Sequence, residues 1–597
     1  MDDDGAMEVI LRTPWDGPWR RFTDPVRIIA ARTAAEVPRA LAQADEEVGR
    51  GRYAAGFVTY EAAAAFALPV RDPHRDVPLV YLGIFDEPTV EGRRRLPDAT
   101  PPAFGPWTPS IDHATYLDAI AAIKDRIEAG DTYQINYTFR LEASFTGEPL
   151  GAMRDLFAAQ NGPWSAYVST GRHVICSASP ELFFSLEGAR VICRPMKGTA
   201  ARGYWADDDI ARAETLRASA KNRAENVMIV DMVRNDLGRI ASTGSVRLVS
   251  LYDVERYPLQ WQMTSTVEGH VPQPSLARLF GAMFPCGSIT GAPKVSSMGI
   301  IRDLEATPRG IYTGAIGYAS PRGRAHFNVA IRTVVFDRVD GRAEFGVGSG
   351  VVWDSIGRDE YDECLLKAEM LSRSPRPAFA GGASYVVDER PEFKLLETIL
   401  WTPEGGFALL DRHLSRLRAS AASFDFACNV DDVLGQLHLA VGDLRGPSRL
   451  RVRLDRDGSV LCEAVDLVPA KDPVRVAVAV EPIDPSDVFL YHKTTRREVY
   501  DRARSSQPDA DTVILWNGAG DATEGTEANL VIVRDGTKMT PPIECGLLPG
   551  TLRAELLASG EIVEARVSKE ELASADEIWL INSVRGWMRA VLIEAAD

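Results

Sequence analysis

The ten residues 285–294, Pro-Cys-Gly-Ser-Ile-Thr-Gly-Ala-Pro-Lys, constrain the fold more than any other stretch of this chain. Glycine, proline, serine and threonine crowd into so few positions that a regular helix or strand is excluded and a tight turn is predicted. Backbone N–H groups, small hydroxyls and the terminal ammonium of Lys294 suit an anionic ligand. Taken alone, such a stretch is more often an ordinary surface loop. Apolar flanking segments, Arg332 and a glycine cluster at 346–350 favour a binding site.

Three motifs around this loop resemble those of the chorismate-binding enzymes. They are Gly-Ser-Ile-Thr-Gly-Ala-Pro-Lys at 287–294, Gly-Ile-Tyr-Thr-Gly at 310–314 and Asn-Val-Ala-Ile-Arg-Thr at 328–333. The family includes the large subunits of anthranilate synthase and aminodeoxychorismate synthase, together with isochorismate and salicylate synthases. The resemblance runs from about residue 110 to 372. It implies an α+β fold in which large antiparallel sheets pack with helices.

Length, charge and cysteine content limit the other possibilities. A chain of 597 residues is expected to form two or more domains. The formal charge of −17 argues against nucleic-acid or anionic-membrane partners, so local Arg and Lys must hold any anionic substrate. Seven scattered cysteines without a C-x-x-C pair indicate reduced thiols. With an acidic N-terminus and no long apolar run, the sequence predicts a cytoplasmic protein.

Glu181 and Lys197 flank a predicted hairpin that turns at 187–188, so the hairpin would bring them close together. An isolated Glu and Lys in this arrangement usually form a cross-strand salt bridge. A catalytic role has stricter demands. Lys197 must be partly neutral to act as a nucleophile, and Glu181 needs a raised pKa to hold a proton that it can give away.

The motif Pro-Met-Lys-Gly-Thr at 195–199 discriminates among the family members. Aminodeoxychorismate synthases carry lysine at its third position, whereas anthranilate synthases carry alanine. The resemblance therefore implies that Lys197 attacks C2 of chorismate while Glu181 protonates the departing C4 hydroxyl. Ammonia would then add at C4, release the lysine and give 4-amino-4-deoxychorismate. Anthranilate synthase chemistry is the alternative, and Lys197 opposes it.

Two charged helical segments, predicted at 207–238 and 358–367, contain the candidate metal ligands. Charged helices of this kind are normally solvated faces with i,i+4 ion pairs. The family resemblance implies instead that Glu225, Glu360 and Glu363 surround a Mg²⁺ ion, directly or through water, and that this ion holds the ring carboxylate of the substrate.

The resemblance also implies a set of substrate-binding residues. Arg332 would form a forked contact with the second carboxylate of the substrate. The other implied positions are Gly287, Ser288, Thr290, Gly291, Lys294, Gly348, Gly350 and Lys367. Gln262 stands where many relatives have a histidine, so a proton-transfer role of that histidine does not carry over to this chain.

A change of composition at 372–384, to Pro, Gly and Ser without periodicity, predicts a domain linker. We place the linker at 373–386, between a first domain at 1–372, whose N-terminal region is 1–110, and a second domain at 387–597. In the second domain, a strand is predicted at 393–400 and an amphipathic helix at 410–417.

Three later segments, 491–496, 521–533 and 547–553, resemble in order and spacing the fourth fold class of pyridoxal-phosphate (PLP) enzymes. This class includes branched-chain and D-amino acid aminotransferases and aminodeoxychorismate lyase. The resemblance covers about 390–597. It implies that Lys493 holds the cofactor and moves protons, and that Glu524 pairs with its pyridine nitrogen. The phosphate would be held by Arg416 and by Thr551 and Leu552 at a helix N-terminus.

The two resemblances together imply consecutive reactions on one chain. The first half would make 4-amino-4-deoxychorismate, and the second would cleave it to 4-aminobenzoate and pyruvate for folate-type biosynthesis. Fusion favours a lyase over an aminotransferase, which is the alternative for the second half. We find no glutaminase-like Cys/His/Glu arrangement, so a separate glutamine amidotransferase subunit is the expected ammonia source. The class IV resemblance also implies a homodimer through the PLP domain.

Overall fold

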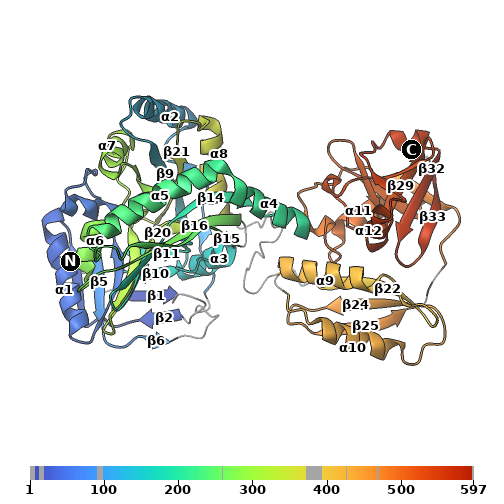
Figure 1. The fold of residues 1–597 in the computed structure, drawn as a ribbon, viewed down its shortest axis with the longest axis horizontal. Helices are drawn as coiled ribbons and strands as arrows, with labels where there is room; N and C mark the ends of the chain where they lie inside the picture. Colours follow the sequence, from blue (N-terminus) through green and yellow to red (C-terminus); the bar gives the residue numbers. More distant parts are fainter. Residues whose placement is uncertain are drawn as a thin grey trace. The chain divides into compact units, whose positions relative to one another are not determined.

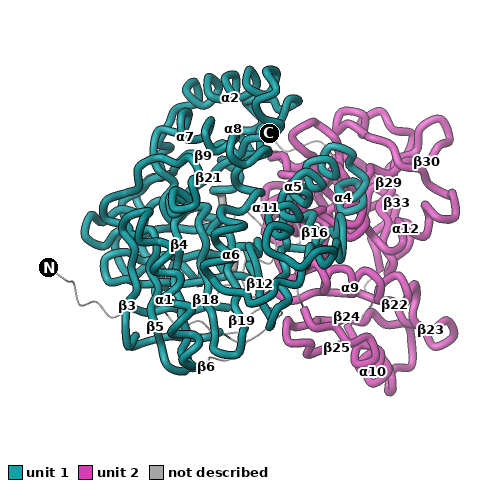
Figure 2. Tube along the Cα trace, turned by 60° about the vertical axis from the view of Figure 1, so that its left-hand side comes forward, with its two compact units in different colours: residues 1–200, 213–374, 384–388 teal, residues 201–212, 375–383, 389–597 magenta. Residues whose placement is uncertain are grey.

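The computed structural model describes residues 7–12, 19–90, 99–257, 260–371, 393–424, 426–465, 467 and 469–593. The chain divides into two compact units (Figure 2). The first comprises 1–200, 213–374 and 384–388, and the second 201–212, 375–383 and 389–597. The predicted linker at 373–386 lies outside the described residues. The segment 201–212 groups with the second unit, which the division proposed from sequence did not anticipate.

The first unit contains two large sheets with antiparallel pairing between neighbouring strands (Figure 1). One sheet has the order β17 (Gly291–Ala292), β9 (Gln134–Thr146), β21 (Arg342–Val351), β20 (Thr333–Asp337), β11 (His173–Ser177), β10 (Ala166–Ser169), β1 (Glu8–Arg12), β2 (Trp19–Phe22), β6 (Thr89–Val90), with β7 (Ala103–Phe104) and β8 (Thr108–Pro109) also pairing with β9. The second has the order β14 (Met196–Ala201), β16 (Gln260–His270), β13 (Arg190–Arg194), β12 (Leu182–Glu187), β19 (Arg324–Val329), β18 (Ala315–Ser320), β4 (Tyr53–Val58), β5 (Val80–Phe85), β3 (Arg27–Ala31), with β15 (Arg247–Arg256) on β16.

The cores of this unit show a four-layer arrangement of helices, sheet, sheet and helices. Because successive strand residues point to opposite faces, Val9 packs in a core shared with Phe57 of the other sheet, whereas Ile10 packs in a core that includes helical residues. The helices are α1 (Val37–Gly49), α2 (His113–Glu128), α3 (Leu150–Gln160), α5 (Ala220–Gly238), α6 (Leu276–Met283), α7 (Lys294–Leu304) and α8 (Gly357–Ala368), whereas α4 (Ala206–Ala218) has residues in both units. The helices α1, α5 and α6 pack against the sheet that contains β12. The helices α2, α3, α7 and α8 pack against the sheet that contains β9. The predicted fold class is confirmed.

Local sequence signals explain where these elements begin and end. Asp112 caps α2 by accepting a hydrogen bond from the Thr115 amide, as an N-cap carboxylate should. The hairpin predicted around 187–188 forms with the expected pairing of Leu186 and Val191. The prediction of a single helix at 207–238 is wrong. The Ser219 side chain accepts from the Asn222 amide and starts a new helix, so the segment divides into α4 and α5.

The second unit contains two further sheets. An antiparallel sheet has the order β23 (Gly406–Phe407), β22 (Leu395–Thr402), β24 (Ser448–Leu454) and β25 (Val460–Val465), with α9 (Leu410–Phe424) and α10 (Val430–Val441) packed on it. A mixed sheet has the order β28 (Ala522–Gly525), β27 (Thr512–Trp516), β26 (Val474–Val478), β33 (Gly586–Leu592), β32 (Glu577–Asn582), β29 (Ala528–Arg534), β30 (Thr537–Thr540) and β31 (Val563–Glu564).

A further pairing between β28 and β29 closes part of the mixed sheet into a ring, which removes one exposed strand edge. The helices α11 (Glu498–Ser506) and α12 (Thr551–Ala558) belong to this part of the unit. The strand and helix predicted at 393–400 and 410–417 correspond to β22 and α9. Among the described residues, no helix combines the length and apolar character needed to cross a bilayer.

Candidate active site

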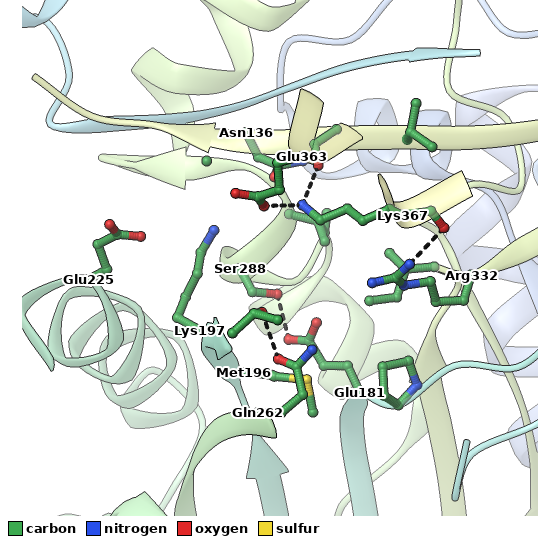
Figure 3. Close-up of a pocket in the computed structure, with 18 of the residues that line it drawn as sticks. Asn136, Glu181, Met196, Lys197, Glu225, Gln262, Ser288, Arg332, Glu363 and Lys367 are labelled. Carbon is green, nitrogen blue, oxygen red and sulfur yellow. Dashed lines mark hydrogen bonds and ion pairs between the residues drawn. The ribbon is translucent and has the colours of Figure 1, made fainter. Parts of the chain in front are cut away.

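A pocket in the first unit gathers most of the polar residues that the sequence singled out (Figure 3). Strands β9, β14, β16 and β21, helices α5 and α8, and the turn that follows Cys286 all contribute to it. The residues that line it include Asn136, Glu181, Lys197, Thr199, Lys221, Glu225, Gln262, Ser288, Arg332, Gly348, Gly350, Glu360, Glu363 and Lys367. Segments more than 200 residues apart in sequence therefore build one site.

Lys197 lies on β14 with its ammonium in this pocket, and no dashed line reaches it in Figure 3. Within the described ranges, the Lys197 ammonium makes no hydrogen bond or ion pair, so the cross-strand salt bridge with Glu181 does not form. Its positive charge nevertheless acts on three neighbouring carboxyl groups. It lowers the pKa values of Glu181, Glu225 and Glu363, whereas burial raises them. The geometry thus leaves the amine available to a ligand.

Glu181 lies just before β12 and is only 3% exposed. Burial raises its pKa to about 7, although hydrogen bonding by Ser288 and the charge of Lys197 oppose the shift. The Ser288 hydroxyl donates to Oε1 of Glu181 at 2.6 Å, and the Cys286 thiol lies 3.8 Å from the same oxygen. Glu181 can therefore hold a proton near neutral pH, as a general acid must.

The carboxylates proposed as metal ligands line the same pocket but have different partners. The Ser355 hydroxyl donates to Glu360 at 2.7 Å, and Glu363 forms an ion pair with Lys367 at 2.5 Å. Burial raises the pKa of Glu225; burial acts in the same direction on Glu363, but Lys367 outweighs it and lowers that pKa.

Among the described residues, no three His, Cys, Asp or Glu side chains stand close enough to enclose a metal ion. The carboxylate oxygens of Glu225, Glu360 and Glu363 are donors of the kind that Mg²⁺ prefers.

Arg332 occupies the bend between β19 and β20 in a left-handed conformation, with φ of 53°. A non-glycine residue in this region is strained, and such strain is concentrated at functional sites. Its guanidinium donates to the Lys367 carbonyl at 2.8 Å. Burial lowers the pKa of Arg332 to about 10, which still leaves it charged at neutral pH. It is thus a buried cation placed to meet an anionic group in the pocket.

The glycine loop takes a different place from the one the sequence suggested. Of the residues proposed there, Ser288 lines the pocket, whereas Gly287, Thr290, Gly291 and Lys294 are outside its lining. The Lys294 ammonium pairs with Asp236 at 2.5 Å and donates to the Met283 carbonyl at 2.9 Å. Residues 291–292 form β17, which pairs with β9. The loop is therefore buried and mainly builds the wall behind the site.

The glycines of β21 make room for the pocket. Gly346, Gly348 and Gly350 alternate along the strand, so they share one face, and all three line the pocket. A Cβ atom would collide with the Tyr312 ring at Gly346, with Thr138 at Gly348, and with Lys197 and Gln134 at Gly350. The binding role expected of Gly348 and Gly350 stays a prediction, but the lack of space explains why the strand carries glycine at every second position.

The second unit brings together the residues expected to hold PLP. Lys493 is buried, and burial together with the charge of Arg416 lowers its pKa to about 8. Within the described residues its ammonium has no hydrogen-bond or ion-pair partner. Glu524 lies on β28. Burial raises its pKa to about 7, and it accepts hydrogen bonds from Tyr500, Asn529 and the Leu548 amide.

The expected phosphate ligands also lie near one another. Thr551 begins α12, and its hydroxyl lies 3.3 Å from Nε2 of His413 on α9. Arg416, on the same helix α9, donates to the Pro549 carbonyl next to the α12 N-terminus. It also pairs with buried Glu397 at 2.7 Å. A helix N-terminus beside an arginine and a buried, unpaired lysine fits a phosphorylated aldehyde cofactor.

Sequence reasoning missed several members of the two sites. Tyr500, which holds Glu524, lies in a helix that carries no motif. Thr199 donates to Gln262 at 3.1 Å, so the residue that replaces the relatives' histidine faces the pocket as a neutral amide. Asn136 lines the pocket from β9. The alternation of polar residues at 134, 136, 138 and 140 was the available signal for that strand.

Comparisons with known proteins agree with this architecture. The model of the chorismate binding enzyme family matches residues 16–373, and that of amino-transferase class IV matches residues 394–593. The chain belongs to the chorismate-binding enzyme family and carries a class IV aminotransferase domain after it.

Two curated relatives match the first part of the chain at nearly equal identity. Aminodeoxychorismate synthase from Streptomyces griseus is 39% identical over 287 residues, covering 48% of this chain and 39% of the relative. Anthranilate synthase component 1 from Streptomyces coelicolor is 38% identical over 299 residues, covering 49% of this chain and 58% of the relative. The chain thus spans less than two thirds of the length of either relative.

A solved structure, anthranilate synthase component I from Streptococcus pneumoniae, is also similar. It superposes with a TM-score of 0.51 at 25% identity, covering 62% of this chain and 94% of that one. Overall similarity does not choose between the two activities, so the choice rests on site residues.

Proposed function

We propose that the first unit converts chorismate and ammonia to 4-amino-4-deoxychorismate. One observation carries this proposal: an amine with no partner in the described structure, that of Lys197, shares a pocket with Glu181, a buried acid whose pKa is raised to about 7. An amine needs a free lone pair to attack carbon, and a general acid needs its proton near neutral pH. A salt-bridged pair would have neither.

In the proposed reaction, Nζ of Lys197 forms a bond to C2 of chorismate. The ring double bonds shift, and the C4 hydroxyl leaves as water with the proton of Glu181. Ammonia then adds at C4, the double bonds shift back, and the bond to Lys197 breaks. Ser288 keeps the acid in place through its 2.6 Å hydrogen bond.

The two carboxylates of the substrate need opposing positive charge. Arg332, buried and charged, would bind one of them through its guanidinium. Mg²⁺ would hold the other, with Glu225, Glu360 and Glu363 as ligands directly or through water. Lys367 would add positive charge next to Glu363.

Anthranilate synthase activity is the competing assignment for the first unit, because a relative with that name is 38% identical. That reaction places the amine at C2 of the ring, the position that Lys197 would occupy here. The lysine in the 195–199 motif thus supports amination at C4 instead.

We further propose that the second unit is a PLP-dependent aminodeoxychorismate lyase that releases 4-aminobenzoate and pyruvate. When bound, PLP supplies an electron sink beside the carbon that loses its proton. Lys493, with its pKa lowered to about 8, would move protons at that carbon. Glu524, held by Tyr500 and Asn529, would face the pyridine nitrogen. An aminotransferase is the alternative, and a requirement for a keto-acid acceptor would identify it.

The proposed pathway implies partners. A separate glutamine amidotransferase would supply ammonia in the cell, and the second unit would form a homodimer as class IV enzymes do. The product would serve a folate-type pathway in the cytoplasm.

The test of the first assignment is Lys197→Ala, assayed for products from chorismate, Mg²⁺ and ammonia. The variant should form no 4-amino-4-deoxychorismate, and any remaining amination should appear as anthranilate. Lys221→Ala is the control, because Lys221 lines the same pocket from α5; it should leave the identity of the product unchanged. Full activity of Lys197→Ala would refute the nucleophile.

A further inference from the structure

Strand β9 places a column of buried polar residues on the side of the sheet that faces the site. Residues 135, 137, 139 and 141 are apolar and pack in a core with helices, whereas Gln134, Asn136, Thr138 and Arg140 alternate with them. Thr138 is held by Glu305 at 2.9 Å, and Asn136 lines the pocket. The column therefore extends from Thr138, which contacts the buried ion pair of Glu305 and Arg309, to Asn136 in the pocket.

Gln134 differs from the rest of this column. Its side chain is 1% exposed, and neither its amide nitrogen nor its amide oxygen has a hydrogen-bond partner within the described residues. A buried amide without partners lowers the stability of the fold. Such a group calls for an explanation, and a role in a reaction or in holding a ligand is one of those known in native proteins.

Gly350 shows where the Gln134 amide points. A Cβ atom added to Gly350 would lie 2.7 Å from Nε2 of Gln134 and 2.6 Å from Nζ of Lys197. Real Cβ atoms do not approach other atoms so closely, so any side chain here would displace one of the two groups. The missing side chain of Gly350 therefore leaves a gap that the amide of Gln134 and the amine of Lys197 both border, without a hydrogen bond between them in the described structure.

We propose that Gln134 is the positioning residue of Lys197: its carboxamide accepts a hydrogen bond from the amine across the gap at Gly350 and aims the nitrogen lone pair at the substrate. This inference rests on the proposed role of Lys197 as nucleophile. Rotation of the amide by half a turn presents its oxygen to the amine, and the two orientations differ only in the hydrogen bonds that they make.

The chemistry explains why an amide suits this position. The charge of Lys197 acts on three carboxyl groups of the pocket, those of Glu181, Glu225 and Glu363. A carboxylate at position 134 would add a further negative charge beside the amine, whereas a neutral amide oxygen can hold the amine without adding charge. Gln134 would thus fix the amine while leaving it reactive.

Two substitutions separate this role from a structural one. Gln134→Leu removes the acceptor but breaks no hydrogen bond of the described structure, so thermal unfolding should be little changed. It should lower kcat for 4-amino-4-deoxychorismate formation by about 10- to 100-fold with KM for chorismate nearly constant, because a misplaced reacting group has costs of that order. Gln134→Glu adds a carboxylate beside Lys197 and should move the rise of the pH–rate profile to higher pH.

A second readout does not depend on activity. Acetylation of Lys197 by acetic anhydride, followed by mass spectrometry across a pH series, reports when the amine becomes reactive. In Gln134→Glu the onset of labelling should move upward by about one pH unit, whereas Thr138→Val, on the same face of the strand, should leave it unchanged.

An unchanged labelling curve and an unchanged pH–rate profile in Gln134→Glu would overturn the inference. A wild-type enzyme that forms no 4-amino-4-deoxychorismate would refute the proposed function instead, which keeps the two failures distinct.

Discussion

The Ser288 hydroxyl donates a 2.6 Å hydrogen bond to a carboxylate oxygen of Glu181. Ser288 comes from the glycine-rich stretch and Glu181 from the residue just before β12, 107 residues earlier. Burial raises the pKa of Glu181 to about 7, and the hydrogen bond opposes that rise because it stabilises the charged form. The glycine-rich stretch therefore tunes the proposed acid instead of supplying the cation that its sequence suggested.

Ser288→Ala should raise the pKa of Glu181 further, because the carboxylate loses a donor. A general acid acts in its protonated form, so the pH at which kcat/KM falls on the basic side should rise by about 0.5–1 unit. The measurement is the pH dependence of kcat/KM for chorismate. Thr199→Val removes a hydrogen bond to Gln262 in the same pocket and is the control. A basic limb that moves downward or stays in place would contradict this role of Ser288.

Glu181→Gln should stabilise the first unit at high pH. The folded-state pKa of about 7 lies above the ordinary glutamate value of 4.5, so between these values the folded protein binds a proton that the unfolded chain has lost. The wild type therefore loses stability from this group as pH rises from 4.5 through 7. Glutamine is neutral throughout, and the variant should gain up to about 3 kcal/mol at pH 8.

The difference should vanish near pH 4, where Glu181 is protonated in both states. Chemical denaturation of the ligand-free protein at both pH values checks this expectation. Equal stability of variant and wild type at pH 8 would show that burial does not raise the pKa of Glu181.

Lys493→Ala should abolish the visible absorbance of bound PLP and the release of pyruvate. The first reaction should continue, so 4-amino-4-deoxychorismate should accumulate, because Lys197 and Lys493 serve separate sites. Lys471→Ala is the matched control, since Lys471 is an exposed lysine of the same unit that pairs with Asp511. Pyruvate release at the normal rate in Lys493→Ala would contradict the assignment.

The sequence predicted local elements well where a turn or a hydrophobic period defined them. The hairpin joining Glu181 to Lys197 and the amphipathic helix predicted at 410–417 follow from signals within a few residues. It failed at Ser219, because a serine within a helical pattern does not reveal whether its hydroxyl faces solvent or caps a new helix.

Long-range pairing explains the other differences. Lys294 ends the most distinctive motif, yet its ammonium forms an ion pair with Asp236 on another helix. Nothing near Lys294 in sequence indicates that partner. Glu524 lies on a short strand whose pairing with β27 and β29 a polar composition does not predict. The gap at Gly350 likewise depends on Gln134 and Lys197, which are far from it in the chain.

Product analysis tests the central proposal most directly. Purified protein is supplied with chorismate, Mg²⁺, ammonia and PLP, and the aromatic product and pyruvate are quantified. We expect 4-aminobenzoate and pyruvate in equal amounts. Accumulation of 4-amino-4-deoxychorismate without pyruvate would contradict the lyase, and anthranilate as the product would contradict the assignment of Lys197 and with it the proposed first reaction.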